Sequence, residues 1–69
     1  MQEEFKLKGE YIKLGQLLKV MNYIDNGSDA KFIIQEGNVK VNGEVALERG
    51  KKIHPGDIVE YKGNSVHVY

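Results

Sequence analysis

The sequence has no cysteine, no long apolar run and no net charge, and each absence excludes a class of protein. The absence of cysteine excludes disulfides, thiolate nucleophiles and cysteine-ligated zinc together. No apolar run approaches the roughly 18 residues of a membrane-spanning helix, and residues 1–4 are acidic, unlike the basic start of a signal peptide. Ten Lys and Arg balance ten Asp and Glu, which argues against coating nucleic acid by bulk charge but leaves a local basic patch open. We expect a cytoplasmic protein.

The chain is short, with 69 residues of which 41% are hydrophobic. A chain of this size buries only about 60% of its unfolded surface. One compact core is therefore possible, whereas a two-domain enzyme with an interdomain cleft is not. We see no internal repeat and no linker, so residues 1–69 are expected to form a single domain.

The first half of the sequence predicts a strand and a helix. In residues 3–8 apolar and charged side chains alternate, as in a half-buried strand. From Ile12 the period changes to that of a helix. Residues 25–27, Asp-Asn-Gly, are of the types that end helices, so we expect the helix to stop there. Its apolar stripe consists of Leu14, Leu17, Leu18, Met21 and Ile24, and its opposite face carries Lys13, Gln16 and Lys19.

A second, shorter helix is predicted to begin at Ser28, which can cap the first backbone N–H groups, with Asp29 in the first turn. Lys31 and Gln35 share an exposed face, and Gly37 stands where a left-handed cap is wanted. The buried stripe is expected to be Ala30, Ile33 and Ile34.

The pair Asn42-Gly43 lies between two apolar alternations and predicts a β-hairpin. A two-residue loop would set Lys40 opposite Val45. A three-residue loop sets Val41 opposite Val45 and keeps one face apolar, so we favour the longer loop.

The remaining sequence predicts short strands at residues 52–53, 58–61 and 66–69, with turns at 54–57 and 63–64. The predicted fold class is α+β, with two short helices packed on a small, mostly antiparallel sheet.

The densest charge run is Arg49-Gly50-Lys51-Lys52, three cations within four residues just after the hairpin. Such a loop is suited to binding phosphate, although a solvated loop that keeps the protein soluble is the simpler interpretation. A basic patch would need further lysines beside it. Candidates are Lys13, Lys19, Lys31 and Lys40, provided that the carboxylates lie elsewhere, as expected for Glu3, Glu4, Glu10, Glu44 and Glu60.

Nothing in the sequence indicates catalysis, a metal site or a cofactor. His54 and His67 lack carboxylates at metal-binding spacing, and Ser28 and Ser65 lie in no nucleophile motif. Both common glycine-rich nucleotide-binding motifs are absent. Most of the aromatic side chains are expected in the core, and Phe32, beside Lys31, is the one that we single out as a possible base-stacking platform.

The order of these parts resembles the S-four RNA-binding domain family, whose fold is also called the alpha-L motif. The matching segments are Ser28-Asp29-Ala30-Lys31, then residues 37–43 with the sequence Gly-Asn-Val-Lys-Val-Asn-Gly, and Gly56-Asp57. The resemblance covers residues 12–61. In its cationic loop and its small size, the chain is similar to the short stand-alone bacterial members of the family, the YaaA- and YbcJ-like proteins.

The resemblance implies an RNA-facing edge. Lys13 matches the basic residue that opens the family's first helix, Lys31 matches the basic residue of the second, and Ser28 and Asn38 fall on the same edge. Gly27 and Gly15 replace an Arg and an Asp that the family often has. The full set of candidate RNA-binding residues is Lys13, Ser28, Lys31, Gln35, Asn38, Lys40, Arg49, Lys51 and Lys52.

The function that we expect is a non-enzymatic RNA-binding module that contacts ribosomal or transfer RNA through phosphates and groove shape, with a role in ribosome assembly or translation and possible contacts to ribosomal proteins. The alternative is a protein-interaction adaptor with the same fold that has lost RNA binding, as zero net charge and Gly27 suggest. A ubiquitin-like sulfur carrier is rejected because residues 66–69 lack a terminal Gly-Gly.

Overall fold

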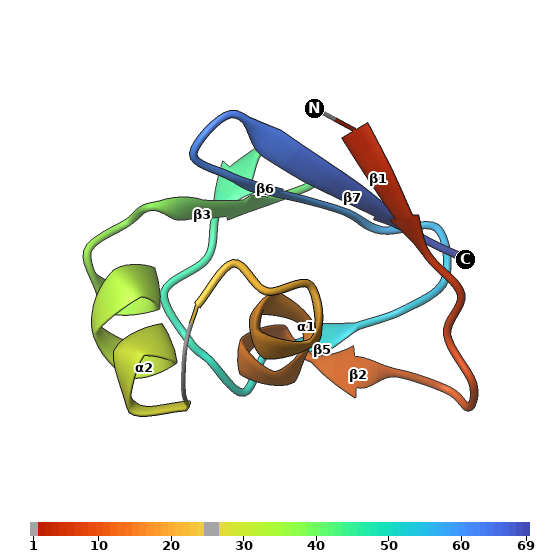
Figure 1. The fold of residues 1–69 in the computed structure, drawn as a ribbon, viewed down its shortest axis with the longest axis horizontal. Coiled ribbons are helices and arrows are strands. Elements are labelled where there is room, and N and C mark those ends of the chain that lie inside the picture. The colour runs from red at the N-terminus through yellow and green to blue at the C-terminus, as the bar shows by residue number, and fades with distance from the viewer. Residues whose placement is uncertain (1, 25–26) are drawn as a thin grey trace.

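The computed structural model describes residues 2–24 and 27–69, with residues 27–29 described by their backbone alone. The described chain forms two layers (Figure 1), one a five-stranded sheet and the other two helices with a two-stranded ribbon. No helix in these described ranges is long and apolar enough to cross a membrane. The elements are β1 (Gln2–Phe5), β2 (Ile12–Lys13), α1 (Leu14–Val20), α2 (Gly27–Gln35), β3 (Val39–Val41), β4 (Glu44–Val45), β5 (Lys52–Ile53), β6 (Ile58–Tyr61) and β7 (Asn64–Val68).

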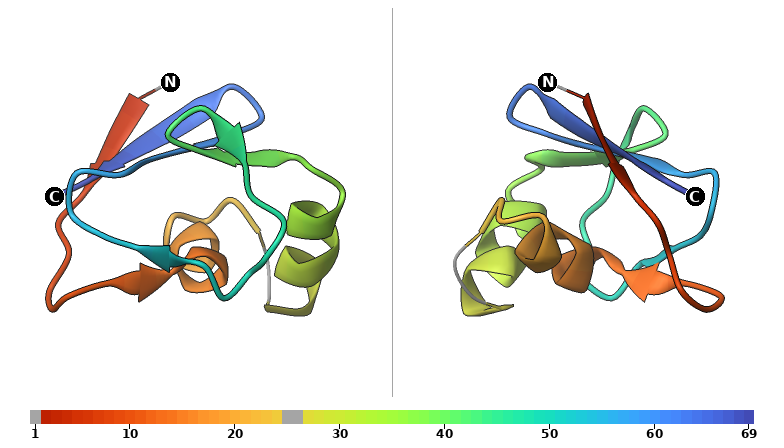
Figure 2. Two further views of the ribbon diagram at one scale, coloured as in Figure 1. Left: turned by 180° about the vertical axis from the view of Figure 1, so that it is seen from behind. Right: turned by 45° about the vertical axis from the view of Figure 1, so that its right-hand side comes forward.

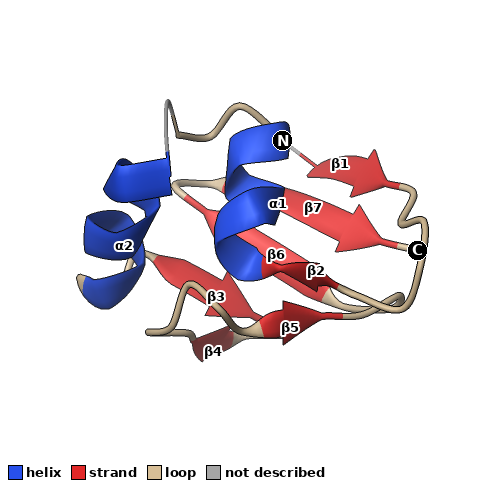
Figure 3. Ribbon diagram, turned by 90° about the horizontal axis from the view of Figure 1, so that it is seen from below, coloured by secondary structure: helices blue, strands red, loops and turns tan. Residues whose placement is uncertain are grey.

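The sheet has the strand order β1-β7-β6-β3-β4, in which only β1 and β7 run parallel. This arrangement confirms the predicted α+β class with a mostly antiparallel sheet. Figure 2 shows from two sides that both helices and the β2–β5 ribbon lie against the same face of the sheet. Seen from below in Figure 3, α1 and the ribbon lie across the strands, while α2 stands beside their end.

The core fills the space between the two layers. Apolar residues that alternate along β3, β6 and β7 meet the stripe of α1, the inner face of α2 and the inner side of the ribbon. The fully buried large side chains are Leu14, Leu17, Leu18, Ile34, Val39, Ile53, Val59, Val66 and Val68. The predicted stripes of both helices are therefore confirmed where the structure describes them, with Met21 and Ile33 partly buried at the margin.

The first helix is shorter at both ends than predicted. Ile12 and Lys13 form β2, which pairs antiparallel with β5, so the helix begins only at Leu14. It ends at Val20, and Asn22 then adopts a left-handed backbone with φ 62°. Ile24, placed on the stripe, is buried but lies beyond the helix, and the predicted stop at Asp25-Asn26 falls outside the described residues.

The second helix begins at Gly27, so Ser28 lies within it and is not the capping residue that we predicted. The predicted end is confirmed, because Gly37 follows with φ 83°, a conformation that glycine adopts without steric cost. Lys31 and Gln35 are exposed, as expected.

The predicted three-residue hairpin loop is wrong. Val41 pairs with Glu44 and Lys40 pairs with Val45, which leaves Asn42 and Gly43 as a two-residue loop. Both loop residues have positive φ, 53° and 85°, the backbone of a type I′ turn whose twist matches the flanking strands. In consequence Val45 is largely exposed, and Leu47 is exposed as well. Ala46 is buried instead, and its N–H donates to the Val39 carbonyl at 2.9 Å.

The terminal strands are shifted from the prediction. β1 covers residues 2–5 instead of 3–8, although Leu7 still donates its N–H to the Tyr69 carbonyl at 2.7 Å. β7 begins at Asn64 and ends at Val68, instead of covering 66–69, because the preceding turn is formed by Lys62 and Gly63. The strands at 52–53 and 58–61 are confirmed.

Candidate functional site

The cationic loop is attached to the start of α1. The N–H of Leu14 donates to the Lys51 carbonyl and that of Gly15 to the Arg49 carbonyl, both at 2.9 Å. The first N–H groups of a helix have no partner within the helix, and Lys13 at the cap position provides no side-chain bond. Loop carbonyls take the place of a capping side chain here, and they hold Arg49 close to Lys13.

This attachment forms a groove between the loop, α1 and α2, which we call the α1–loop groove. Its lining residues are Lys13, Gly15, Gln16, Lys19, Ala30, Arg49 and Gly50. Among these described lining residues three are cations and none is acidic. Two other grooves on the described surface contain carboxylates, from Glu44, Glu48 and Asp57 in one and Glu60 in the other. Of these three grooves, the α1–loop groove is the one best suited to binding a polyanion.

Gly15 explains how the loop packs so closely against α1. A Cβ atom at this position would lie 3.4 Å from the Arg49 Cβ, 3.5 Å from the Arg49 carbonyl oxygen and 3.6 Å from the Ala30 Cβ. An Asp, which the resembling family often has here, would bring its carboxylate next to Arg49. With glycine at position 15, no such carboxylate comes from α1.

The two other cations of the run, Lys51 and Lys52, do not line the α1–loop groove with Arg49. Lys52 pairs with Lys13 across the β2–β5 ribbon, and its Nζ lies 4.9 Å from the centre of the Tyr11 ring. Lys51 lines a different groove, together with Asp57, whose carboxylate it influences electrostatically. The structure thus places Lys13 and Arg49 in the α1–loop groove, whereas Lys51 and Lys52 both line the groove that also holds Asp57.

The other predicted residues are spread over several surfaces. Lys31 and Gln35 are exposed on α2, and the Ser28 side chain lies outside the described part. Asn38 donates from its amide to the Ile33 carbonyl at 3.2 Å, which places it at the end of α2. Lys40 and Asn38 line a third groove on the sheet, where Lys40 pairs with Glu60. These two residues are not brought together with Lys13 and Arg49.

Two of the groove and ribbon residues, Gln16 and Tyr11, are not among the candidates predicted from the sequence, and Lys19 is a candidate for the basic patch but not a member of the RNA-binding set. Gln16 and Lys19 lie on the exposed face of the first helix, which proves to be the groove wall. Tyr11 was expected in the core but remains 40% exposed. Tyr11, Ile12 and Lys13 alternate with the period of a strand, and this alternation is the sequence signal that could have identified Tyr11.

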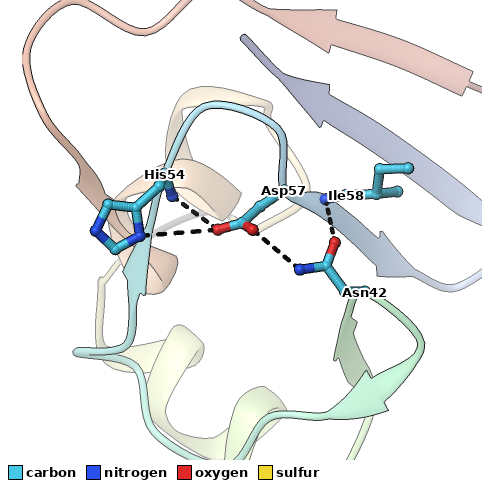
Figure 4. A network of polar contacts seen from close by, with 4 residues as sticks. All are labelled: Asn42, His54, Asp57 and Ile58. Carbon is cyan, nitrogen blue, oxygen red and sulfur yellow. Dashed lines mark hydrogen bonds and ion pairs between the residues drawn. The ribbon is translucent and has the colours of Figure 1, made fainter.

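The Asn-Gly and Gly-Asp parts of the family pattern have a structural role, shown in Figure 4. The Asn42 amide donates to Asp57 Oδ1 at 2.9 Å, and its Oδ1 accepts the Ile58 N–H at 2.9 Å. Asp57 Oδ2 accepts the His54 N–H at 2.8 Å. Together these bonds join the hairpin turn to the turn before β6, and we call them the Asn42–Asp57 latch.

The latch also determines the ionisation of Asp57. Partial burial by itself raises the pKa of this carboxyl group. The hydrogen bonds from the His54 N–H and the Asn42 amide, with the nearby charges of His54 and Lys51, act in the opposite direction and hold the pKa below its ordinary value of 3.8. Asp57 is therefore an anionic acceptor of the latch at neutral pH.

Comparison with known proteins places this fold and its motifs in a family. RlbA of Bacillus subtilis, a probable ribosome maturation protein, is 40% identical over 63 residues, which are 91% of this chain and 89% of that protein. YbcJ of Escherichia coli is 39% identical over 61 residues, 88% of this chain and 87% of that protein. A tyrosine–tRNA ligase of Burkholderia lata is 33% identical over 57 residues, 83% of this chain but 14% of the ligase.

The solution structure of Escherichia coli YbcJ, described as revealing an αL motif involved in RNA binding, matches with a TM-score of 0.71. The match covers 94% of this chain and 84% of that one, at 39% identity. The family model described as the S4 domain matches residues 5–69, a longer segment than the 12–61 of the motif resemblance. The chain belongs to the S4 domain family.

Proposed function

We propose that this chain is a non-enzymatic RNA-binding module that acts in ribosome maturation, with structured ribosomal RNA as its partner class and transfer RNA as the second. The observation that carries the proposal is the α1–loop groove, where Lys13, Lys19 and Arg49 lie around Gly15 and Ala30 and no described lining residue is acidic. RNA binding in YbcJ and ribosome maturation in RlbA support it, because both relatives match most of this chain.

The proposed RNA contacts differ between the groove residues and the residues around the groove. Lys13, Lys19 and Arg49 contact RNA phosphates directly, and Gln16 supplies a hydrogen bond. Lys31 and Gln35 on α2 extend the same surface, and Ser28 belongs to that helix. Lys52 extends it across the ribbon, and Lys51 contributes at the margin. Asn38 and Lys40, on the sheet, lie outside the contact surface.

The proposed unit of binding is the single domain of residues 1–69, with the motif core at 12–61, and its place of action is the cytoplasm. Contacts of this kind read phosphate positions and the shape of a folded RNA more than its base sequence. We accordingly expect similar affinity for several structured RNAs and a strong dependence on salt.

Binding to ribosomal and transfer RNA at two salt concentrations tests the proposal. The triple variant Lys13→Ala/Lys19→Ala/Arg49→Ala should bind far more weakly than the unmodified chain. The slope of log K against log salt should flatten by about 0.7 to 0.9 for each lost phosphate contact.

The matched control is Lys6→Ala/Lys8→Ala/Lys40→Ala, which removes the same charge from exposed positions outside the groove. It should retain most of the affinity. Equal losses in both triple variants would show that net charge, and not the groove, governs binding. Absence of RNA binding by the unmodified chain at low salt would refute the proposal.

The adaptor alternative has one observation in its favour. Val45 and Leu47 are 52% and 56% exposed and line the groove that also holds Lys51 and Asp57. Exposed apolar side chains of this kind occur in protein interfaces. The double variant Val45→Ser/Leu47→Ser distinguishes the two functions, since RNA affinity should be unchanged if the α1–loop groove is the binding surface.

A further inference from the structure

The outer face of the β2–β5 ribbon carries an aromatic and cationic group of side chains that the α1–loop groove does not include. Ile12 pairs with Ile53 and Lys13 with Lys52, and Ile53 is fully buried. Side chains alternate along a strand, so the neighbours of these isoleucines project to the outer face. The group consists of Tyr11, Lys13, Lys52 and His54, and we call it the ribbon platform.

The Tyr11 ring is the centre of the platform. It is 40% exposed, with the Lys52 Nζ 4.9 Å from its centre and the His54 ring centre 6.2 Å away, tilted by 49°. Both neighbours are themselves exposed. A partly open aromatic ring with a lysine ammonium group beside it is an arrangement with which proteins stack a nucleobase while holding its phosphate.

The platform is continuous with the α1–loop groove through Lys13, which belongs to both. The groove has cations and small residues but no aromatic ring, whereas the platform supplies the ring. A nucleic-acid strand that follows the cations past Lys13 reaches Tyr11 next.

We propose that the ribbon platform binds an unpaired nucleotide, with the base stacked on Tyr11 and the adjacent phosphates held by Lys13 and Lys52. This inference rests on the proposed RNA-binding function and specifies its target as RNA in which a paired segment is followed by an unpaired one. The paired segment occupies the groove, and the unpaired base occupies the platform.

A second tyrosine–histidine pair in the same chain provides the control. The ring centres of His67 and Tyr69 are 6.3 Å apart and tilted by 44°, nearly the geometry of Tyr11 and His54, and Tyr69 is 50% exposed. This pair lies on the sheet, where Glu4 is the register partner of His67. Both pairs thus have similar ring geometry and a carboxylate near the histidine, Asp57 in the case of His54, but in the described part of the chain a lysine lies over the Tyr11 ring and none over the Tyr69 ring.

The test compares an RNA hairpin bearing an unpaired overhang with the same hairpin lacking it, at low salt. We expect the unmodified chain to favour the overhang by roughly 5- to 150-fold, the range of one stacked base. Tyr11→Ala should abolish this preference, while Tyr11→Phe and the control Tyr69→Ala should retain it. Affinity for the blunt hairpin should be the same in all four proteins.

A fluorescence measurement provides an independent check, because the chain has no tryptophan. In Tyr11→Trp, the overhang hairpin should quench the indole emission and the blunt hairpin should leave it nearly unchanged. An unaltered overhang preference in Tyr11→Ala, or an equal loss in Tyr69→Ala, would overturn the platform while leaving groove binding intact. If the unmodified chain bound neither hairpin, the proposed function would fail and the platform with it.

Discussion

At the scale of single residues, Asn42 shows how one side chain serves both the local backbone and a distant turn. Its φ of 53° lies in the left-handed region, which asparagine tolerates better than most residues other than glycine. Its side-chain NH₂ group donates to Asp57 and its side-chain oxygen accepts the Ile58 N–H, and these partners lie 15 and 16 positions further along the chain. The sequence pattern predicted the turn from Asn-Gly, but the partner of the side chain depends on the tertiary fold.

Replacing Asn42 should separate these two contributions. Asn42→Gly removes the latch but keeps the left-handed backbone free of strain, and we expect a loss of about 1 kcal/mol in the free energy of unfolding, since the bonds are exposed. Asn42→Ala also places a Cβ in the left-handed region and should lose about 2 kcal/mol. Chemical denaturation measures both values. Equal losses would mean that the backbone conformation adds no cost, and no loss in either would mean that the latch does not stabilise the fold.

At the scale of elements, the errors of prediction share a physical cause. β2 has two residues, and nothing in the local sequence distinguishes them from the start of a helix. They form a strand because they pair with Lys52 and Ile53, about forty residues further along the chain. The hairpin register was chosen to keep Val45 on the apolar face, but the turn geometry of Asn42 and Gly43 prevailed and Ala46 fills the core position. The apolar stripes of the helices are local signals and were predicted correctly in the described residues. The loop length of the hairpin, the exact turn before β7 and the pairing partners depend on the tertiary fold and were not.

A hydrogen bond between elements gives a second prediction. The Tyr23 hydroxyl, just beyond α1, donates to Glu3 Oε2 of β1 at 2.9 Å. Burial of the ring first, then this bond and the charge of Glu3, raise the pKa of Tyr23 from 10.0 to about 12. An alkaline absorbance titration should show one of the four tyrosines ionising near pH 12. Tyr23→Phe should remove that component, and Glu3→Gln should shift it toward lower pH.

The sign of the stability effect follows from the raised pKa. Below the ordinary value of 10.0 the hydroxyl is protonated in both folded and unfolded chains, so the contribution of the bond is complete. Between 10.0 and about 12 the unfolded chain releases this proton while the folded chain keeps it, and the contribution declines as the pH rises. The stability difference between the unmodified chain and Tyr23→Phe should therefore shrink across this interval. A difference that stayed constant would contradict the bond to Glu3.

At the scale of the whole molecule, a net charge of zero coexists with a groove whose described charged residues are all cations. Glu3, Glu4, Glu44 and Glu60 lie on the sheet, while Lys13, Lys19 and Arg49 line the opposite layer. Zero net charge is one of the two observations behind the adaptor alternative, but composition does not report where the charges lie. The loop carbonyls that cap α1 place Arg49 in the same groove as Lys13, an arrangement that depends on the tertiary fold.

Gly15→Asp tests whether local or total charge governs binding. The variant lowers the net charge by one and places a carboxylate in the groove beside Arg49. The fold should tolerate it, because an acid in the first turn of a helix is favourable and the added Cβ meets its neighbours at 3.4 Å or more. The control Gln2→Glu lowers the net charge equally on the exposed edge of β1.

Because a charge at contact distance in water is worth about 1 kcal/mol, Gly15→Asp should weaken RNA binding roughly fivefold at low salt and less at high salt. Gln2→Glu should change it little, and both variants should unfold at the denaturant concentration of the unmodified chain or above it. Titration of each variant with the blunt RNA hairpin measures the affinities. Equal weakening by the two substitutions would show that the overall charge of the chain governs binding, whereas weakening by Gly15→Asp alone would show that the charge of the groove governs it. Position 15, where this chain has Gly and the family often has Asp, therefore decides between the two explanations.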